Sequence, residues 1–251
     1  MKSIPAGYQP PADLLRDRVI LVTGAGDGIG ASAAKTFAAH GATVILLGKT
    51  IPKLEAVYDA IVSRQHPQPA IYPMDLEGAT YEHYEQLADT LYKEFDHLDG
   101  LLHNAAILGA RMMIEQYDLK LWARVLHINL TAPFLLSRAC LPLLRKSADA
   151  RVVFTSTGVA HEGRAYWGAY GVSKAGADNL MQIMADELET NTPIRVNSID
   201  PGVVGTRIRR LAFPAEDAST LPTPDMVMPA YLYLMGPDSK DETGQIFLAQ
   251  S

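Results

Sequence analysis

The chain has 251 residues, of which 48% are hydrophobic and 20% charged, and its formal net charge is −6. This composition is typical of a folded globular protein with a substantial core and not of a disordered chain. No stretch approaches the roughly 20 consecutive apolar residues that cross a bilayer, and no apolar signal segment follows the first residue, so we expect a cytoplasmic protein without a membrane partner.

Short β-branched segments alternate with longer helical patterns along the whole chain, which indicates consecutive βαβ units. Strands are predicted over residues 18–23, 43–47, 70–72, 98–103, 151–155, 194–199 and 245–248. Helices are predicted over residues 29–39, 51–63, 81–95, 118–144 and 167–189, the fourth of them interrupted near Pro133. The fold class is therefore α/β: a single doubly wound Rossmann-type domain over residues 1–251, with a parallel sheet of about seven strands and helices on both faces.

Two segments lie outside this alternation. Residues 1–16 form an N-terminal extension before the first strand. Residues 204–224 are polar and interrupted by prolines, so we expect a substrate lid there. The lid carries the densest basic patch of the chain, Arg207, Arg209 and Arg210. This patch is either a solvated turn or a contact to an anionic group near the site, and without a longer basic run we expect no nucleic-acid partner.

A glycine-rich turn joins the first predicted strand to the first predicted helix. Such a turn lets the backbone approach a pyrophosphate at the helix N-terminus, so the strand–turn–helix context predicts dinucleotide binding rather than a tight turn alone. The residues expected to bind the dinucleotide here are Gly24, Gly26, Asp27, Gly28, Ile29 and Gly30.

Tyr170 and Lys174 lie four residues apart at the start of a predicted helix. This spacing puts both side chains on one helix face. An ammonium beside a phenol stabilises the phenolate and lowers its pKa from about 10, so Tyr170 can serve as a general acid or base. The same spacing also arises by chance on exposed helices, and it gains weight here from the glycine-rich turn.

The two motifs together resemble the short-chain dehydrogenase/reductase family in its compact form, over nearly the whole chain. Residues 103–106 are similar to the family's NNAG sequence, with Ala106 at its last glycine, and Asn129 lies at its helical asparagine. Residues 201–206 match its PGxxxT motif. By this resemblance, further contacts to a nicotinamide cofactor come from Asn104, Ala105, Ala106, Tyr170, Lys174, Pro201, Gly202, Val204 and Thr206.

More closely, residues 8–10, 24–30, 163–165 and 234–236 look like a bacterial YciK-type branch of this family. The resemblance implies a fold and a chemistry without naming a metabolite.

The chain departs from the family at the position of the catalytic serine, where it has Thr157. Thr157 keeps a hydroxyl for a substrate carbonyl, but its methyl group restricts its rotamer. Ser156 is the adjacent candidate, and strand alternation would turn it away from the pocket unless the chain bends. We expect catalysis by Asn129, Thr157, Tyr170 and Lys174, and substrate contacts from Ser156, His161 and Tyr166.

The residues after the second predicted strand bear on the choice between NADP(H) and NAD(H). A carboxylate there suits the ribose 2′-hydroxyl of NAD, and a basic residue suits the 2′-phosphate of NADP. Gly48 and Lys49 favour NADP(H), with NAD(H) as the alternative because Asp27 would repel a phosphate. Asp75 and Leu76 match the family's adenine-contacting position, although an aspartate there also caps turns.

These features predict an NAD(P)(H)-dependent oxidoreductase that interconverts a ketone or aldehyde and an alcohol, with a small-molecule substrate and no metal. The resemblance gives Tyr170 the proton transfer, Lys174 the nicotinamide ribose, and Asn129 a water link from Lys174 to solvent. The alternative is an NADP(H)-binding regulatory or scaffold protein with weak or lost catalysis, because Thr157 and Ala106 depart from the family. In the family the two long helices pack between subunits, so we expect a homodimer or homotetramer.

Overall fold

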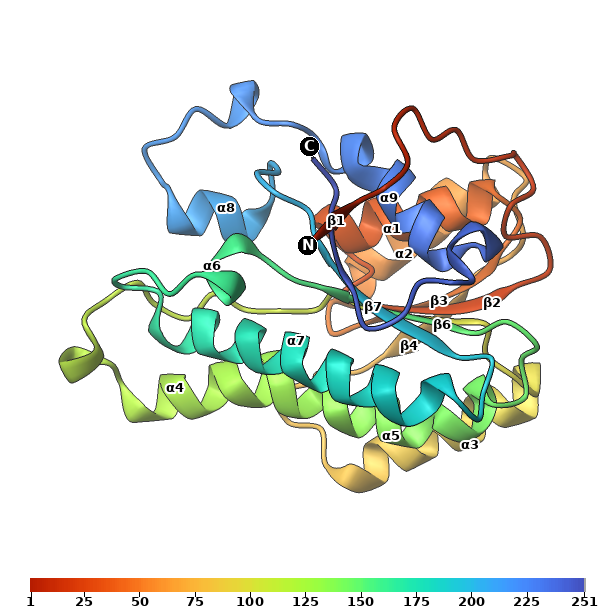
Figure 1. Ribbon diagram of the computed structural model, residues 1–251, viewed down its shortest axis with the longest axis horizontal. Coiled ribbons are helices and arrows are strands. Elements are labelled where there is room, and N and C mark those ends of the chain that lie inside the picture. Colours follow the sequence, from red (N-terminus) through yellow and green to blue (C-terminus); the bar gives the residue numbers. More distant parts are fainter. Residues whose placement is uncertain (251) are drawn as a thin grey trace.

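A parallel sheet of eight strands lies at the centre of the computed structural model, which describes residues 1–250 (Figure 1). The strands are β1 (Lys2–Ser3), β2 (Val19–Thr23), β3 (Thr43–Gly48), β4 (Ala70–Pro73), β5 (Gly100–His103), β6 (Arg151–Thr155), β7 (Arg195–Asp200) and β8 (Ile246–Leu248). Their order across the sheet is β1-β8-β7-β6-β5-β2-β3-β4, and all neighbouring pairs are parallel. The predicted doubly wound α/β domain is confirmed.

The sheet has one strand more than the sequence predicts. The additional strand, β1, lies in the segment expected to be an extension, and it pairs with β8 at the sheet edge, with Lys2 opposite Phe247. Both of its residues are exposed, so no hydrophobic pattern marks this strand.

Two layers of helices cover the sheet. One layer contains α1 (Gly28–Ala39), α2 (Ile51–Val62) and α9 (Met228–Met235), and the other contains α3 (Tyr81–Phe95), α4 (Leu119–Leu126), α5 (Ala132–Leu144) and α7 (Gly168–Glu189) (Figure 1). Two short helices, α6 (Gly158–His161) and α8 (Arg207–Ala212), follow the carboxyl ends of β6 and β7, and single 3₁₀ turns cover Ile114–Gln116, Ala218–Thr220, Pro224–Val227 and Pro237–Ser239. The sequence does not predict α6, α8 or α9.

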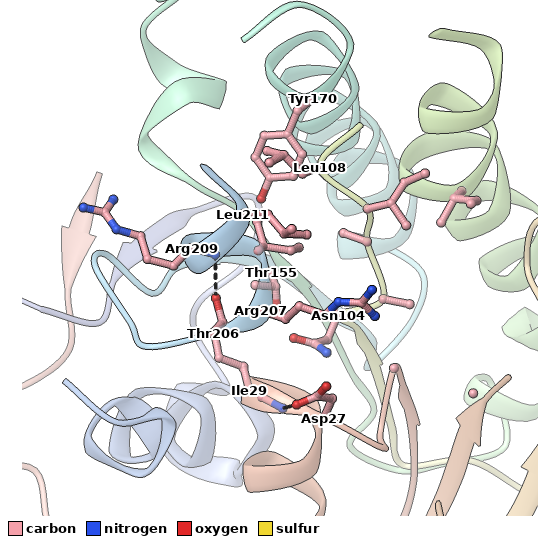
Figure 2. Close-up of a pocket in the computed structure, with 18 of the residues that line it drawn as sticks. Asp27, Ile29, Asn104, Leu108, Thr155, Tyr170, Thr206, Arg207, Arg209 and Leu211 are labelled. Carbon is pink, nitrogen blue, oxygen red and sulfur yellow. Dashed lines mark hydrogen bonds between the residues drawn. The ribbon is translucent and has the colours of Figure 1, made fainter. Parts of the chain in front are cut away.

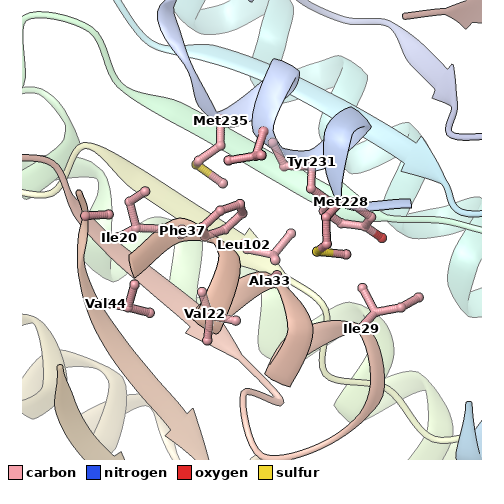
Figure 3. Close-up of a cluster of buried hydrophobic side chains, with 14 of the residues drawn as sticks. Ile20, Val22, Ile29, Ala33, Phe37, Val44, Leu102, Met228, Tyr231 and Met235 are labelled. Carbon is pink, nitrogen blue, oxygen red and sulfur yellow. The ribbon is translucent and has the colours of Figure 1, made fainter. Parts of the chain in front are cut away.

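The core is divided by the sheet because the central strands are buried on both faces. In β2, Ile20 and Val22 pack under α1 and α9, where they join Phe37 and Met235 (Figure 3). The alternate residues of β2 point to the opposite face and pack with the α3–α5–α7 layer. This arrangement explains the continuous apolar run of the first strand, since a parallel strand covered on both faces has no solvent side.

The long helix predicted over residues 118–144 is interrupted earlier than expected. A π-helical turn, His127–Thr131, separates α4 from α5, and Pro133 lies in the first turn of α5. The π turn runs directly into α5 through Thr131 and Ala132, which are both helical, so Pro133 lies within a continuous helical run and has no N–H to donate to the Asn129 carbonyl. The interruption places Asn129 inside the π turn, where it is buried.

The strand order reverses between β5 and β2, because the chain first builds outward from β2 to β4 and then returns to β5 on the other side. In such sheets the crevice outside the carboxyl ends of the strands at this reversal is the usual ligand site.

Candidate active site

A cavity of about 570 Å³ opens at this reversal, within the size range of small-molecule sites. It is lined by the turns that follow β2 to β7 and by α7 and α8. Of the residues singled out in the sequence, it brings together Gly24, Gly26, Asp27, Gly28, Ile29, Gly48, Lys49, Asp75, Leu76, Asn104, Ala105, Ala106, Ser156, Thr157, Tyr170, Lys174, Pro201, Gly202, Val204 and Thr206. Four others, Gly30, Asn129, His161 and Tyr166, do not line it.

The glycine-rich turn needs its glycines for two reasons. Gly24 and Gly28 have φ of +66° and +51°, a region that side chains disfavour. Gly30 is needed for close packing, because a Cβ there would lie 2.3 Å from the Gly24 carbonyl oxygen and 2.5 Å from Asn104 Nδ2. Gly30 therefore supports the turn from behind and does not face the cavity.

Asn104 is held against the end of β2. Its backbone N–H and that of Ala105 both donate to Thr23 Oγ1, at 2.9 and 3.0 Å, and Asn104 Nδ2 donates to the Thr23 carbonyl at 3.2 Å. The side of the cavity formed by residues 104–106 is thereby fixed relative to the glycine-rich turn.

Two ion pairs lie at the end of the cavity nearest β3. Lys53 Nζ is 2.5 Å from Asp27 Oδ2, and this hydrogen bond is the main reason that the pKa of Asp27 is lowered. Lys49 Nζ is 3.8 Å from Asp75 Oδ2, while Asp75 Oδ1 accepts a hydrogen bond from the Glu77 N–H. The charge of Asp27, expected to repel a phosphate, is thus balanced by a lysine that the sequence analysis did not single out.

Thr157, Tyr170 and Lys174 share the wall nearest β6. The side chain of Thr157 makes no capping hydrogen bond to α6, so its hydroxyl is available to the cavity. Burial raises the pKa of Tyr170 above the usual range of a phenol, and Asp200 raises it further. Burial lowers the pKa of Lys174 to about 8, although Asp178 opposes this change.

The contact between the lysine and the tyrosine differs from the sequence expectation. Lys174 Nζ donates to the Thr155 carbonyl oxygen at 2.8 Å, and within residues 1–250 no hydrogen bond joins it to the Tyr170 hydroxyl. The lowering of the Tyr170 pKa inferred from their spacing is wrong for this arrangement, because the ammonium points at the end of β6 and burial of the phenol dominates.

Of the three residues proposed for substrate contact, Ser156 alone lines the cavity, and its hydroxyl is bonded elsewhere. Ser156 Oγ donates to Asp178 Oδ2 at 2.5 Å, so its hydroxyl points away from the cavity, as strand alternation implies. His161 lies next to the same carboxylate, 3.5 Å away. Tyr166 is 49% exposed. The neighbouring Trp167, by contrast, lines the cavity and packs against Tyr170.

Asn129 uses its whole side-chain amide inside the protein. Its Oδ1 accepts from the Ile107 N–H, and its Nδ2 donates to the Ile107 carbonyl at 2.9 Å and to Ser173 Oγ at 3.0 Å. The amide therefore ties the segment after β5 to α7, between Tyr170 and Lys174, and does not itself reach the cavity.

The outer wall of the cavity is apolar and comes mainly from α8. Figure 2 shows Tyr170 and Leu108 at one end of the cavity and Asp27 and Ile29 at the other, with Arg207 extended toward Asn104 between them. The apolar lining near Tyr170 consists of Trp167 and of six residues that sequence patterns did not mark, Ile107, Leu108, Ile208, Leu211, Ala212 and Phe213. Arg111 holds this wall closed, because its guanidinium donates to the Ala212 carbonyl and lies 4.9 Å from the rings of Trp167 and Phe213.

Residues 18–217, which contain the glycine-rich turn and the Tyr170–Lys174 pair, match the family described as short chain dehydrogenase. The chain belongs to the short-chain dehydrogenase family. Within this family it is 47% identical over 243 residues to the uncharacterised oxidoreductase YciK of Escherichia coli K12, covering 97% of this chain and 96% of YciK. The resemblance to YciK-type oxidoreductases is thus confirmed.

Solved structures of short-chain dehydrogenases superpose closely on this one. A short-chain dehydrogenase from Pseudomonas syringae is 51% identical with a TM-score of 0.95, over 97% of this chain and 98% of that chain. Another, from Escherichia coli CFT073 in complex with NADPH, is 47% identical with a TM-score of 0.93, over 96% of this chain and 100% of that chain.

Across residues 1–250, none of the helices has the length and apolar character that crossing a membrane requires.

Proposed function

We propose that this short-chain dehydrogenase is an NADP(H)-dependent oxidoreductase that interconverts a ketone or aldehyde and the corresponding alcohol. One observation carries the proposal: the glycine-rich turn and the side chains of Thr157, Tyr170 and Lys174 face a single cavity. A dinucleotide site and a proton-transfer site that share one cavity are what hydride transfer requires.

The cavity fits the diphosphate and the 2′-phosphate of the cofactor. A Cβ at Gly28 would lie 3.5 Å from the Thr206 methyl carbon, so the glycine keeps space between the helix N-terminus and residue 206 for a diphosphate. Near β3, Lys49, Thr50 and Lys53 line the cavity, and Gly48 brings no carboxylate, which favours a 2′-phosphate over a free 2′-hydroxyl. The NADPH complex of the E. coli CFT073 relative supports the same choice. When bound, NADP(H) supplies or accepts the hydride.

The proposed roles of the protein side chains follow from their protonation. Because its pKa is raised, Tyr170 is protonated at neutral pH and donates its proton to the oxygen of a ketone during reduction, with Thr157 Oγ as a second donor. Lys174, whose pKa of about 8 keeps most of it charged at neutral pH, would hold the nicotinamide ribose, since its ammonium is directed at the Thr155 carbonyl and not at the Tyr170 hydroxyl. Asn129 fixes the segment after β5 through its side-chain amide, so a water link from Lys174 to solvent would use its backbone carbonyl.

The apolar outer wall suggests that the substrate carries a hydrophobic group, and residues 204–224, which include α8, would act as the lid. We also propose that the protein is cytoplasmic and a homodimer or homotetramer, since the layer of α5 and α7 exposes large apolar side chains.

The test combines cofactor binding with turnover. Calorimetry with NADPH and NADH is followed by an absorbance assay of NADPH oxidation with a panel of hydrophobic ketones and aldehydes. Tyr170→Phe should keep NADPH affinity within about twofold and reduce kcat by at least about a hundredfold, because general acid catalysis contributes that much. Tyr166→Phe, which changes an exposed phenol outside the cavity, is the matched control and should behave as the unmodified protein.

Other outcomes separate the alternatives. Tight NADPH binding without turnover across the panel would favour the regulatory or scaffold function. If neither NADPH nor NADH binds, both the oxidoreductase and the regulatory function are ruled out.

A further inference from the structure

A buried polar cluster lies beside the cavity and has no part in the proposed chemistry. We call it the His161 cluster; its members are Ser156, His161, Asp178 and Asp200. Asp178 Oδ2 accepts a hydrogen bond from Ser156 and lies 3.5 Å from His161 Nδ1, while His161 Nε2 lies 3.8 Å from Asp200 Oδ2. The two aspartates are only 6% and 7% exposed.

Two carboxylates at this depth require compensation, because an unpaired buried charge is costly. Asp200 Oδ1 accepts from the Gly202 N–H, and burial raises the pKa of Asp200, with Asp178 adding to the rise and His161 opposing it. The other ionisable groups that face the cluster are Lys174, which acts on Asp178, and the phenols of Tyr170 and Tyr231, which interact with Asp200.

His161 is the group able to serve both carboxylates. A protonated imidazole has two N–H donors, and here one ring nitrogen faces each aspartate, whereas a neutral ring has only one donor. His161 Nε2 and Asp178 Oδ1 are buried without a hydrogen-bond partner within residues 1–250, and both ion-pair distances exceed an ordinary hydrogen bond. The contacts therefore have room to shorten when the ring carries its proton.

Each member of the cluster adjoins a segment of the candidate site. Ser156 directly precedes Thr157 at the end of β6. Asp178 lies one helical turn after Lys174 on α7, on the same face. Asp200 directly precedes Pro201 and Gly202 at the end of β7. The cluster thus joins the ends of β6 and β7 to α7. The relative placement of these three segments decides whether Thr157, Lys174 and residues 201–202 face the same cavity.

We propose that the protonated His161 side chain bridges Asp178 and Asp200 and so positions the ends of β6 and β7 against α7 for catalysis. His161, Asp178 and Asp200 are positioning residues in this assignment, since none of them contacts the reacting atoms. The importance of this positioning for turnover rests on the proposed function, whereas the bridge itself does not.

The test compares His161→Gln, which removes the charge, with His161→Arg, which keeps a permanent cation. In His161→Gln, kcat for NADPH-dependent reduction should fall at least tenfold while the NADPH Kd stays within about twofold. His161→Arg should retain kcat within about threefold of the unmodified protein, and its activity should persist to higher pH because arginine does not lose its proton. Asp178→Asn should lower kcat as His161→Gln does and leave the NADPH Kd equally unchanged. Agreement between the two variants shows that the effect is not specific to one substitution.

A second measurement does not depend on activity. Amide hydrogen exchange over residues 156–162 and 199–205 should accelerate at least fivefold in His161→Gln and remain close to the unmodified rate in His161→Arg. Equal exchange in all proteins, or equal kcat and pH profiles, would overturn the proposal. If the unmodified protein turns over no carbonyl compound, the proposed function fails, and the exchange rates still decide whether the bridge exists.

Discussion

His103, at the end of β5, is held neutral by its surroundings. It is 5% exposed, its Nε2 lies 2.8 Å from Ser137 Oγ, and burial, assisted by the charge of Lys174, lowers its pKa to about 3. An exposed histidine in an unfolded chain has a pKa of about 6.5. Between these two values the unfolded chain binds a proton that the folded chain does not, so the fold loses stability as the pH falls from about 6.5 toward 3.

We therefore expect His103→Asn, which restores the residue typical of the family, to make the free energy of unfolding depend less on pH in the acid range. Between pH 6 and 4, its free energy of unfolding should fall less steeply than that of the unmodified protein, by up to about 1.4 kcal/mol per pH unit. Urea denaturation at several pH values measures this slope. His66→Asn, between α2 and β4, is the control and should keep the original slope; identical slopes for His103→Asn and the unmodified protein would contradict the explanation.

Sequence reasoning predicts which residues belong to the site better than it predicts the contacts that these residues make. Residues such as Gly28, Asn104 and Lys174 are marked by motifs that occur in a fixed order along the chain, so their gathering into one cavity could be predicted. The pairing of Lys53 with Asp27 could not, because it depends on how α2 lies against the glycine-rich turn. The direction of the Lys174 ammonium likewise depends on the carbonyl that β6 happens to present.

Among the elements, α8 carries a cation, Arg207, that faces the cavity without an acidic partner within residues 1–250. Arg209 is paired with Glu216 at 2.6 Å, whereas within residues 1–250 no carboxylate pairs with Arg207, which lines the cavity. The start of α8 overlies the glycine-rich turn, since a Cβ at Gly28 would lie 3.5 Å from the methyl carbon of Thr206. A diphosphate bound at that turn would lie within reach of the Arg207 guanidinium.

We expect Arg207→Ala to weaken NADPH binding by about tenfold, equivalent to about 1.4 kcal/mol, and to reduce its salt dependence. NADH should be weakened equally if the contact is to the diphosphate, and much less if it is to the 2′-phosphate. Calorimetry at two salt concentrations measures both effects. Arg145→Ala, an exposed residue at the end of α5 outside the cavity lining, is the control. Unchanged affinity in Arg207→Ala would show that Arg207 does not contact the cofactor.

The elements that sequence patterns missed lack a one-sided hydrophobic period, each for its own reason. β1 has two exposed residues and forms because the edge of β8 is available, and α8 has six residues, too few for a hydrophobic period to be visible. α9 is apolar on nearly every side, since the chain covers it all round, and it therefore lacks the one-sided pattern of a surface helix. The longer amphipathic elements and the buried strands, by contrast, follow directly from their periodicity.

For the whole molecule, the helix layer of α3, α4, α5 and α7 carries exposed large apolar side chains on α5 and α7. Phe134 on α5 and Val172 and Ile183 on α7 are 47%, 51% and 49% exposed. We expect light scattering to give the mass of a dimer or tetramer, and Phe134→Lys combined with Ile183→Lys to lower it. Val62→Lys, on α2 in the opposite layer, should leave the mass unchanged; a monomer at micromolar concentration would contradict the expectation.

The two walls of the cavity are formed by different sets of side chains. The nucleotide wall is built by the turns after β2 to β5 together with residues 201–207, whereas the apolar wall near Tyr170 is built by Leu108, Trp167 and the apolar side chains of α8. Substitutions in the apolar wall can therefore change which compounds are accepted while the nucleotide groove keeps its sequence. Evolution, or a laboratory selection, can explore new substrates here by varying these apolar side chains, without having to rebuild the redox half of the site.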